Sequence, residues 1–140
     1  MSALKEKIFE KMNEHTLASF ATVTEDGKPW TRYIVVKADE ELNIWFATFL
    51  NSRKALQITK NPEVHLTLGV NDPQTAVFWL QVQGRAHLFE DAETRNTVWY
   101  DMLSSIFSGP DDPNYLVCKV KPYRIEYYMM NIPKPEIWEG

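Results

Sequence analysis

The segment from residue 48 to residue 62, TFLNSRKALQITKNP, holds the side chains with the clearest chemical potential. Ser52 stands where it would cap a short helix, and the cations Arg53 and Lys54 follow in the first turn. A helix N-terminus already carries about half a positive charge, so cations are unfavourable there unless an anion joins them. A capping hydroxyl, free backbone amides, a guanidinium and an ammonium together predict a phosphate-binding site. The alternative is a solvated basic turn.

The elements that must position this segment show clear periodicities. Strands are predicted, from runs of apolar and β-branched residues, over residues 16–24, 29–38, 42–48, 64–70, 76–89, 115–122 and 124–130. Helices are predicted over residues 1–14 and 91–107 and directly after Ser52; Asp91 would cap the second of them. The Asp26-Gly27 pair predicts a tight hairpin between the first two strands. The strand 76–89 exceeds the usual length, so we expect a bend or bulge near Gly84.

Strands joined mainly by hairpins, with helices at early, middle and late positions, predict a mainly β fold. We expect a single domain over residues 1–140, an antiparallel β-barrel of six or seven strands with helices packed outside it. The residues 131–140 contain two prolines and should form an extended tail, because proline cannot pair within a central strand. Cys118 alternates in phase with Leu116 and Val120, which predicts a buried structural thiol.

Composition excludes several classes of function. A net charge of −4 and a pI near 5.4 disfavour a nucleic-acid partner, and no apolar run approaches the ~18 residues that span a membrane. The single cysteine indicates a reducing cytoplasm as the location. Five glycines, scattered along the chain, form neither a dinucleotide-binding fingerprint nor a P-loop. Three scattered histidines make a zinc site improbable, and the acidic run from Asp39 to Glu41 is interpreted as a solvated turn.

Several motifs occur together in one order. The second strand of the hairpin reads T-R-Y-I-V-V-K, the segment after it W-F-A-T-x-x-x-S-R-K-A-x-x-I-x-x-N-P, and the closing strands V-K-P-Y-R-I-E-Y-Y. From about residue 4 to residue 130 the chain resembles the FMN-binding split barrel of the pyridoxamine 5′-phosphate oxidase-like superfamily, particularly its general stress protein branch. The S-R-K-A motif with Asn61-Pro62 after it is the most specific part of the resemblance.

The resemblance implies FMN as the cofactor and assigns its phosphate to the helix start. Arg53 and Lys54 would bind the phosphate, with Ser52 and Thr48 beside it. This implication agrees with the anion site inferred above from charge and capping. A deazaflavin or haem in place of FMN stays open.

The resemblance further implies that the second strand of the hairpin lies along the isoalloxazine ring. Its ring-binding residues would be Arg32, Tyr33, Ile34 and Val35. Lys37 would reach the phosphate or the ring from the end of the strand. The alternative for Arg32 is an outward-facing strand cation, and for Tyr33 an aromatic at a subunit interface.

The resemblance implies a cytoplasmic homodimer, with the flavin at the subunit interface, that transfers hydride or electrons to or from a small-molecule substrate. No residue stands out as a catalytic acid or base. The family's oxidases grip pyridoxal phosphate with C-terminal Arg and His residues, whereas this sequence has neither after Arg124, so vitamin B6 oxidation is not expected. One alternative is a flavin-binding stress or redox-sensing protein without turnover; the other is a barrel that binds single-stranded nucleic acid, which the acidic charge disfavours.

Overall fold

The structure, a computed structural model, describes residues 1–70 and 72–140 of the chain. Its helices are α1 (Ala3–Glu10), α2 (Arg53–Lys60), α3 (Ala92–Val98) and a 3-10 helix, η1 (Asp101–Ser105). Its strands are β1 (Thr16–Val23), β2 (Pro29–Ala38), β3 (Ile44–Phe49), β4 (Glu63–Leu68), β5 (Phe78–Phe89), β6 (Tyr115–Met129) and β7 (Glu136–Glu139). The elements as far as β5 follow the predicted order. After β5, the predicted helix 91–107 is divided into α3 and η1, the two predicted closing strands form the single strand β6, and β7 lies in the predicted tail.

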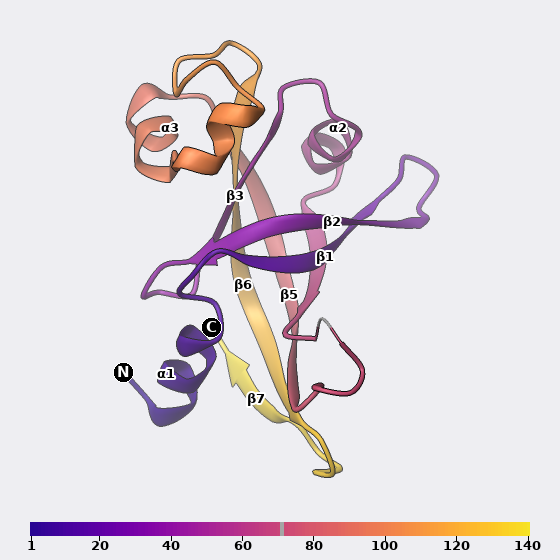
Figure 1. Cartoon of the computed structure of the whole chain (residues 1–140). Helices are drawn as coiled ribbons and strands as arrows, with labels where there is room; N and C mark the ends of the chain where they lie inside the picture. Colours follow the sequence, from indigo (N-terminus) through magenta and orange to yellow (C-terminus); the bar gives the residue numbers. More distant parts are fainter. Residues whose placement is uncertain (71) are drawn as a thin grey trace.

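The strands form an antiparallel barrel. They pair in the order β3-β2-β1-β4-β5-β6-β7, and β3 also pairs with β6, which closes the first six into a barrel and leaves β7 as an added edge strand (Figure 1). Gly27 lies in the turn between β1 and β2 with a φ of 81°, as the Asp-Gly pair predicts. The predicted fold class, a mainly β antiparallel barrel with helices outside it, is confirmed.

Strand β6 is one continuous strand, although the sequence predicts two strands there. Gly84 of β5 lies opposite Pro122 of β6, and the register between them shifts after Gln83. A Cβ atom on Gly84 would lie 2.7 Å from Val120 Cγ1, so glycine lets the two strands approach closely. The irregularity predicted near Gly84 is confirmed, and it accommodates a proline inside the paired strand.

The predicted helix over residues 91–107 is wrong in its length. Asp91 caps α3 by accepting a hydrogen bond from the Thr94 amide, as predicted, but the helix ends at Val98. The backbone is extended at Trp99 and Tyr100, and both side chains pack against the buried cluster around Tyr115. In a continuous helix, neighbouring side chains diverge by about 100°, so tertiary packing favours the break.

The two ends of the barrel are covered differently. Helix α1 is shorter than the predicted 1–14 and contacts β7, with an ion pair of 2.5 Å between Lys7 and Glu136. The predicted extended tail 131–140 contains the short edge strand β7, which pairs with β6. Figure 1 shows α1 and β7 together at one end of the barrel and α2 and α3 at the other.

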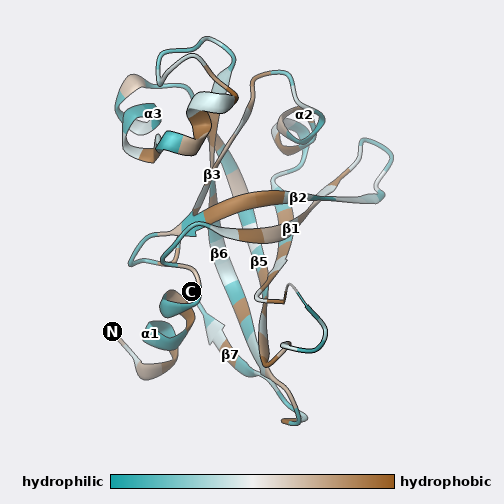
Figure 2. Cartoon of the chain, in the orientation of Figure 1, coloured by the Kyte–Doolittle hydropathy of each residue, from teal (hydrophilic) through white to brown (hydrophobic). Residues whose placement is uncertain are grey.

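The core follows the alternation of the strands. Figure 2 shows apolar residues along the middle of β1 and β2 and alternating apolar and polar residues along β5 and β6. Cys118 is fully buried, which confirms the predicted structural thiol. Within residues 1–70 and 72–140, no helix has the length and apolar character needed to cross a membrane.

Candidate functional site

The start of α2 is built from local hydrogen bonds. Strand β3 ends at Phe49, and the Ser52 hydroxyl caps α2 by accepting a hydrogen bond of 3.2 Å from the Ala55 amide. The hydroxyls of Ser52 and Thr48 are 3.0 Å apart and share a hydrogen bond, and Thr48 is buried. The predicted cap is confirmed, and two hydroxyl oxygens meet at the helix N-terminus.

Three cations, Arg32, Arg53 and Lys54, gather around this N-terminus. The guanidinium of Arg53 lies 5.0 Å from the centroid of the Trp30 ring, and Lys54 is half-buried. Burial and the nearby Arg32 lower the pKa of Lys54, and burial and Arg53 lower the pKa of Arg32. In the part of the chain that the structure describes, none of the three forms an ion pair with Asp or Glu. A bound anion would relieve their mutual repulsion and offset the cost of burial.

A cavity of about 280 Å³, the β2 pocket, lies beside Lys54. Five of the predicted site residues line it: Tyr33, Ile34, Val35, Thr48 and Lys54. Its rim is apolar and open, because Phe49, Met102 and Ile106 are exposed. A half-buried lysine in the wall of a mainly apolar cavity suits a ligand with a planar ring and an anionic tail.

The other four predicted site residues do not line the β2 pocket. Ser52 reaches it only through its hydrogen bond to Thr48, and Arg53 lines a separate groove of about 590 Å³ between α2 and the β1–β2 turn. Lys37 lines a different cavity, described below. Arg32 lies on the face of β2 opposite to Tyr33, so its assignment to the isoalloxazine ring stays a prediction.

Arg32 is instead held by the elements around it. Its guanidinium donates hydrogen bonds to the Thr22 hydroxyl at 2.7 Å, to Gln57 Oε1 at 3.2 Å and to the carbonyls of Phe20 and Trp30. These acceptors belong to β1, β2 and α2. Arg32 therefore ties the helix to the barrel and contributes positive charge from below the helix start.

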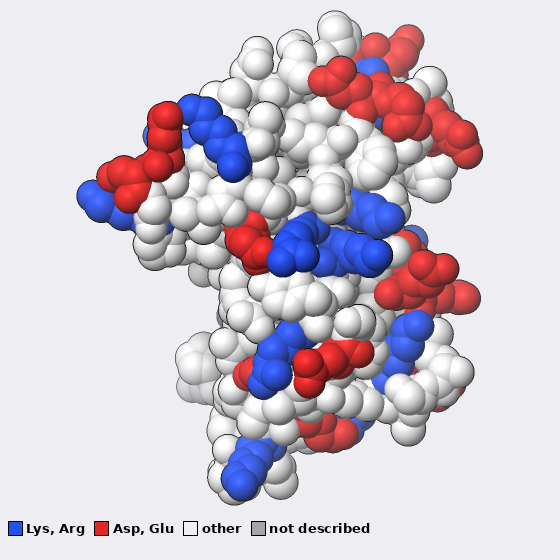
Figure 3. Space-filling view, turned by 180° about the vertical axis from the view of Figure 1, so that it is seen from behind, with Lys and Arg blue, Asp and Glu red and all other residues white. Residues whose placement is uncertain are grey.

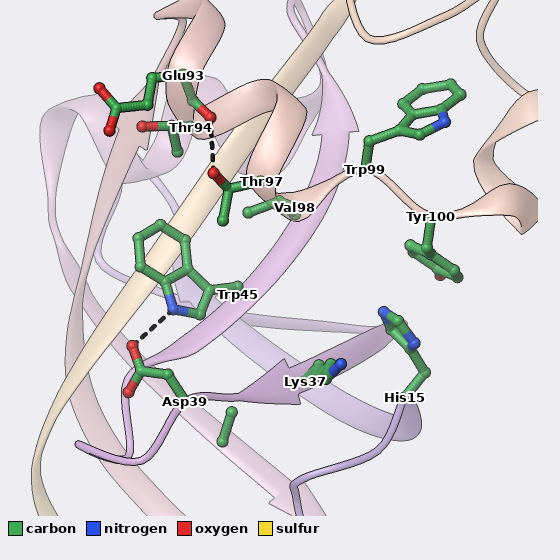
Figure 4. A pocket seen from close by; sticks show the side chains of 11 residues that line it. His15, Lys37, Asp39, Trp45, Glu93, Thr94, Thr97, Val98, Trp99 and Tyr100 are labelled. Carbon is green, nitrogen blue, oxygen red and sulfur yellow. Dashed lines mark hydrogen bonds between the residues drawn. The ribbon is translucent and has the colours of Figure 1, made fainter.

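A second cavity of about 460 Å³, the Trp45 pocket, was not foreseen from the sequence. Its lining includes His15, Lys37, Trp45, Thr97, Trp99 and Tyr100 (Figure 4). These residues come from the segment before β1, from β2, from β3 and from α3 and its end, so no local motif joins them. Tyr100 lines the β2 pocket as well, and the two cavities are neighbours.

Two residues of the Trp45 pocket, Asp39 and His15, hold its aromatic rings. Asp39, interpreted as part of a solvated turn, accepts hydrogen bonds from Trp45 Nε1 at 3.0 Å and from Asn43, and so fixes the indole ring. His15 stacks on Tyr100, with 3.7 Å between the ring centroids. Partial burial, and then the nearby Lys37, lower the pKa of His15, so its ring is neutral at pH 7.

The family model described as pyridoxamine 5′-phosphate oxidase matches residues 4–129. General stress protein 26 of Bacillus subtilis (strain 168) is 33% identical over 119 residues, which are 85% of this chain and 84% of that protein. A pyridoxine/pyridoxamine 5′-phosphate oxidase of Actinobacillus succinogenes is 28% identical over 154 residues, covering 98% of this chain and 67% of the oxidase.

Solved structures agree with these relatives. The crystal structure of general stress protein 26 from Bacillus anthracis str. Sterne superposes with a TM-score of 0.84 and 29% identity, covering 99% of this chain and all of the other. Two more distant structures share the fold. A protein from Nostoc punctiforme superposes with a TM-score of 0.62 and 18% identity, covering 88% of this chain and 78% of the other. A protein from Mycobacterium smegmatis superposes with a TM-score of 0.78 and 12% identity, covering 100% of this chain and 59% of the other. By the extent of the family match and the identity to its relatives, the chain belongs to the pyridoxamine 5′-phosphate oxidase family.

Proposed function

We propose that this protein binds FMN in the β2 pocket and acts as an oxidoreductase on a small substrate. The observation that supports this most is the positive charge at the start of α2, where Lys54 is half-buried without a carboxylate partner among the described residues. A phosphate ester supplies the missing counter-charge and accepts hydrogen bonds from the hydroxyls and amides of the helix N-terminus.

Different residues of this chain would hold the phosphate and the ring of the cofactor. Lys54, Thr48, Ser52 and, after leaving Trp30, Arg53 would hold the phosphate. The segment Tyr33–Val35 would lie along the isoalloxazine ring and exclude water from one side of it. When bound, FMN supplies the hydride or electron transfer, for which the protein's own side chains are not suited.

Family membership supports the proposal without deciding the cofactor. The Nostoc punctiforme structure is described as an FMN binding protein related to pyridoxamine 5′-phosphate oxidase, and the Mycobacterium smegmatis structure as a heme binding protein. Both are too distant to transfer a ligand by identity alone. The fully buried Cys118 suits a reducing compartment, and we propose the cytoplasm as the location.

Titration with flavins tests the proposed cofactor. We expect FMN to bind at least ten times more tightly than riboflavin, which has the same ring but no phosphate, because the helix start contributes charge-assisted hydrogen bonds worth about 1.5–3 kcal/mol each. Quenching of flavin fluorescence measures both affinities, and a parallel titration with haemin is followed by the Soret band. Equal affinities for FMN and riboflavin, or tighter binding of haemin, would contradict the proposal.

We further propose that the protein is a homodimer with the flavin at the subunit interface. Among the described residues, the helices mainly contact β7, β1, β5, β3 and β6 rather than β2. On β2, Tyr33 is 75% exposed, and Leu17 of the neighbouring β1 is 47% exposed. With Met102 and Ile106 they make an apolar patch around the mouth of the β2 pocket, as expected of a surface that a second copy covers.

Sedimentation equilibrium at micromolar concentration, with FMN present, should therefore give about twice the chain mass of 16.3 kDa. Tyr33→Glu should shift the mass toward the monomer, because a carboxylate would be buried without a partner. Met130→Glu is the matched control, since Met130 is exposed in the turn after β6, far along the chain from the patch. A monomer in the unmodified protein, or a dimer unaffected by Tyr33→Glu, would rule out this interface.

A further inference from the structure

The Trp45 pocket has aromatic walls that are held in fixed positions. Figure 4 shows the Trp45 ring facing Thr97 and Val98 of α3 across the cavity, with the His15–Tyr100 stack at its other end. The hydrogen bond from Trp45 Nε1 to Asp39 fixes the indole, and the stacking with His15 fixes Tyr100. A cavity of about 460 Å³ falls within the range of small-molecule sites, and its flat aromatic walls favour a planar ligand.

The charges around the Trp45 pocket disfavour an anion. At neutral pH the charged side chains that line it are Lys37, Asp39 and Glu93, which sum to one negative charge because the ring of His15 is neutral. A phosphate dianion would meet two carboxylates and one lining cation, with the ammonium of Lys119 5.3 Å from the centroid of the Trp45 ring as a second cation nearby. It would also lack the helix start and hydroxyl cap found beside Lys54. The Trp45 pocket therefore differs from the phosphate site at α2.

The polar groups that line the Trp45 pocket include the Glu93 carboxylate, which is an acceptor, and two donors that a ligand could use. The hydroxyl of Thr94 already donates to Asp91 at 2.8 Å, and the hydroxyl of Thr97 donates to the Glu93 carbonyl at 2.9 Å. The ammonium of Lys37 and the hydroxyl of Tyr100 form no hydrogen bond with any residue in the ranges 1–70 and 72–140. A ligand here would satisfy these donors with an oxygen acceptor.

We propose that the Trp45 pocket binds an uncharged planar aromatic compound that carries a carbonyl oxygen, a quinone or an aromatic ketone, with the oxygen accepting a hydrogen bond from Lys37 or Tyr100. As a binding site it needs no cofactor. As the substrate site it rests on the proposed function, because Tyr100 separates it from the β2 pocket where FMN would lie. Two electrons and two protons would then pass from reduced FMN to a quinone, leaving oxidised FMN and a hydroquinone.

Indole ¹⁵N–¹H spectra test the binding site directly, because the chain has five tryptophans and only Trp45 and Trp99 line this pocket. Menadione, an uncharged naphthoquinone, should shift the Trp45 and Trp99 signals and leave those of Trp79 and Trp138 in place. Menadiol bisphosphate, which has the same ring but two phosphate groups, should cause no shift at the same concentrations. Trp45→Phe and Trp99→Phe assign the two signals.

A matched pair of variants on α3 locates the ligand. Thr97→Phe fills the pocket and should weaken menadione binding at least about tenfold, equivalent to roughly 1.4 kcal/mol. Asn96→Phe, the neighbouring exposed position, lines none of the cavities described above and should leave the affinity unchanged. Both side chains make one hydrogen bond to a carbonyl of the same helix, so the two changes carry a similar cost for the helix itself.

The outcomes separate this inference from the proposed function. Shifts spread equally over Trp79 and Trp138, equal binding of the bisphosphate, insensitivity to Thr97→Phe, or displacement of menadione by FMN would overturn the Trp45 pocket as a separate ligand site. Menadione shifts at Trp45 in a protein that does not bind FMN would keep the site and reject the flavin function. FMN binding without any menadione shift would keep the flavin function and reject the Trp45 pocket as a ligand site.

Discussion

The double variant Arg53→Ala/Lys54→Ala is expected to lose FMN affinity by tens to thousands of times. Each cation removed takes away a charge-assisted contact to the phosphate, worth roughly 1.5–3 kcal/mol. Arg53 is exposed and Lys54 half-buried, and neither has an ion-pair partner among the described residues, so their removal breaks no salt bridge of the fold. The loss should therefore appear in flavin binding and leave the thermal midpoint of the FMN-free protein within a few degrees.

The single variants Lys54→Ala and Arg53→Ala should differ in their affinity for FMN. Lys54 lines the β2 pocket, whereas Arg53 lies over Trp30 and lines the groove on the other side of α2. Lys54→Ala should therefore weaken FMN binding more than Arg53→Ala does. Lys60→Ala is the control on the same helix, because Lys60 pairs with Glu25 at 2.8 Å in the last turn. Parent-like FMN affinity in the double variant, by fluorescence titration, would end the phosphate assignment.

The protein loaded with FMN is expected to oxidise pyridoxamine 5′-phosphate with a specificity constant below about 10⁴ M⁻¹s⁻¹, the lower end for ordinary enzymes. Such a substrate needs a second cationic site. Two of the cations outside the proposed FMN site already have partners: Arg85 pairs with Glu63 at 2.7 Å, and Arg124 pairs with Glu126 at 2.8 Å. Lys37, Lys119 and Lys121 form no ion pair among the described residues, but they lie on strands, without the helix start and capping hydroxyl that assist Lys54. Figure 3 shows Lys and Arg side chains interspersed with Asp and Glu over the face behind that of Figure 1.

The missing contacts set the size of this effect. Losing two or three charge-assisted hydrogen bonds to the substrate phosphate costs several kcal/mol of transition-state binding. Pyridoxamine without its phosphate is the matched substrate, and the two should be turned over equally slowly in a peroxide-release assay. A strong preference for the phosphate ester, with a specificity constant above that bound, would contradict the expectation and place the missing cations on a second subunit.

Local features of the fold and of the helix start were predictable from the sequence. The cap at Ser52, the cations after it and the Asp26-Gly27 turn each depend on neighbours a few residues apart, and the structure bears them out. The irregularity near Gly84 follows from strand length and a missing side chain. Period-two alternation likewise predicts which residues of each strand face the core, because side chains in a strand alternate between its two faces.

Features that depend on contacts between distant segments were decided by the tertiary structure. The sequence predicts that the helix continues through Trp99 and Tyr100, yet packing against Tyr115 favours an extended backbone there and ends α3 early. Strand alternation places Arg32 and Tyr33 on opposite faces of β2. The acceptors that Arg32 finds on its face belong to β1 and α2, and only the tertiary structure brings them there.

The Trp45 pocket is the clearest example of a feature that only the tertiary structure decided. His15, Trp45 and Tyr100 are separated by tens of residues, and no single motif contains all three. They meet because closure of the barrel brings the ends of β2 and β3 next to the break after α3. Local periodicity in the sequence does not predict that these three residues lie close together. Their proximity results from burying apolar surfaces of segments that are far apart in the chain.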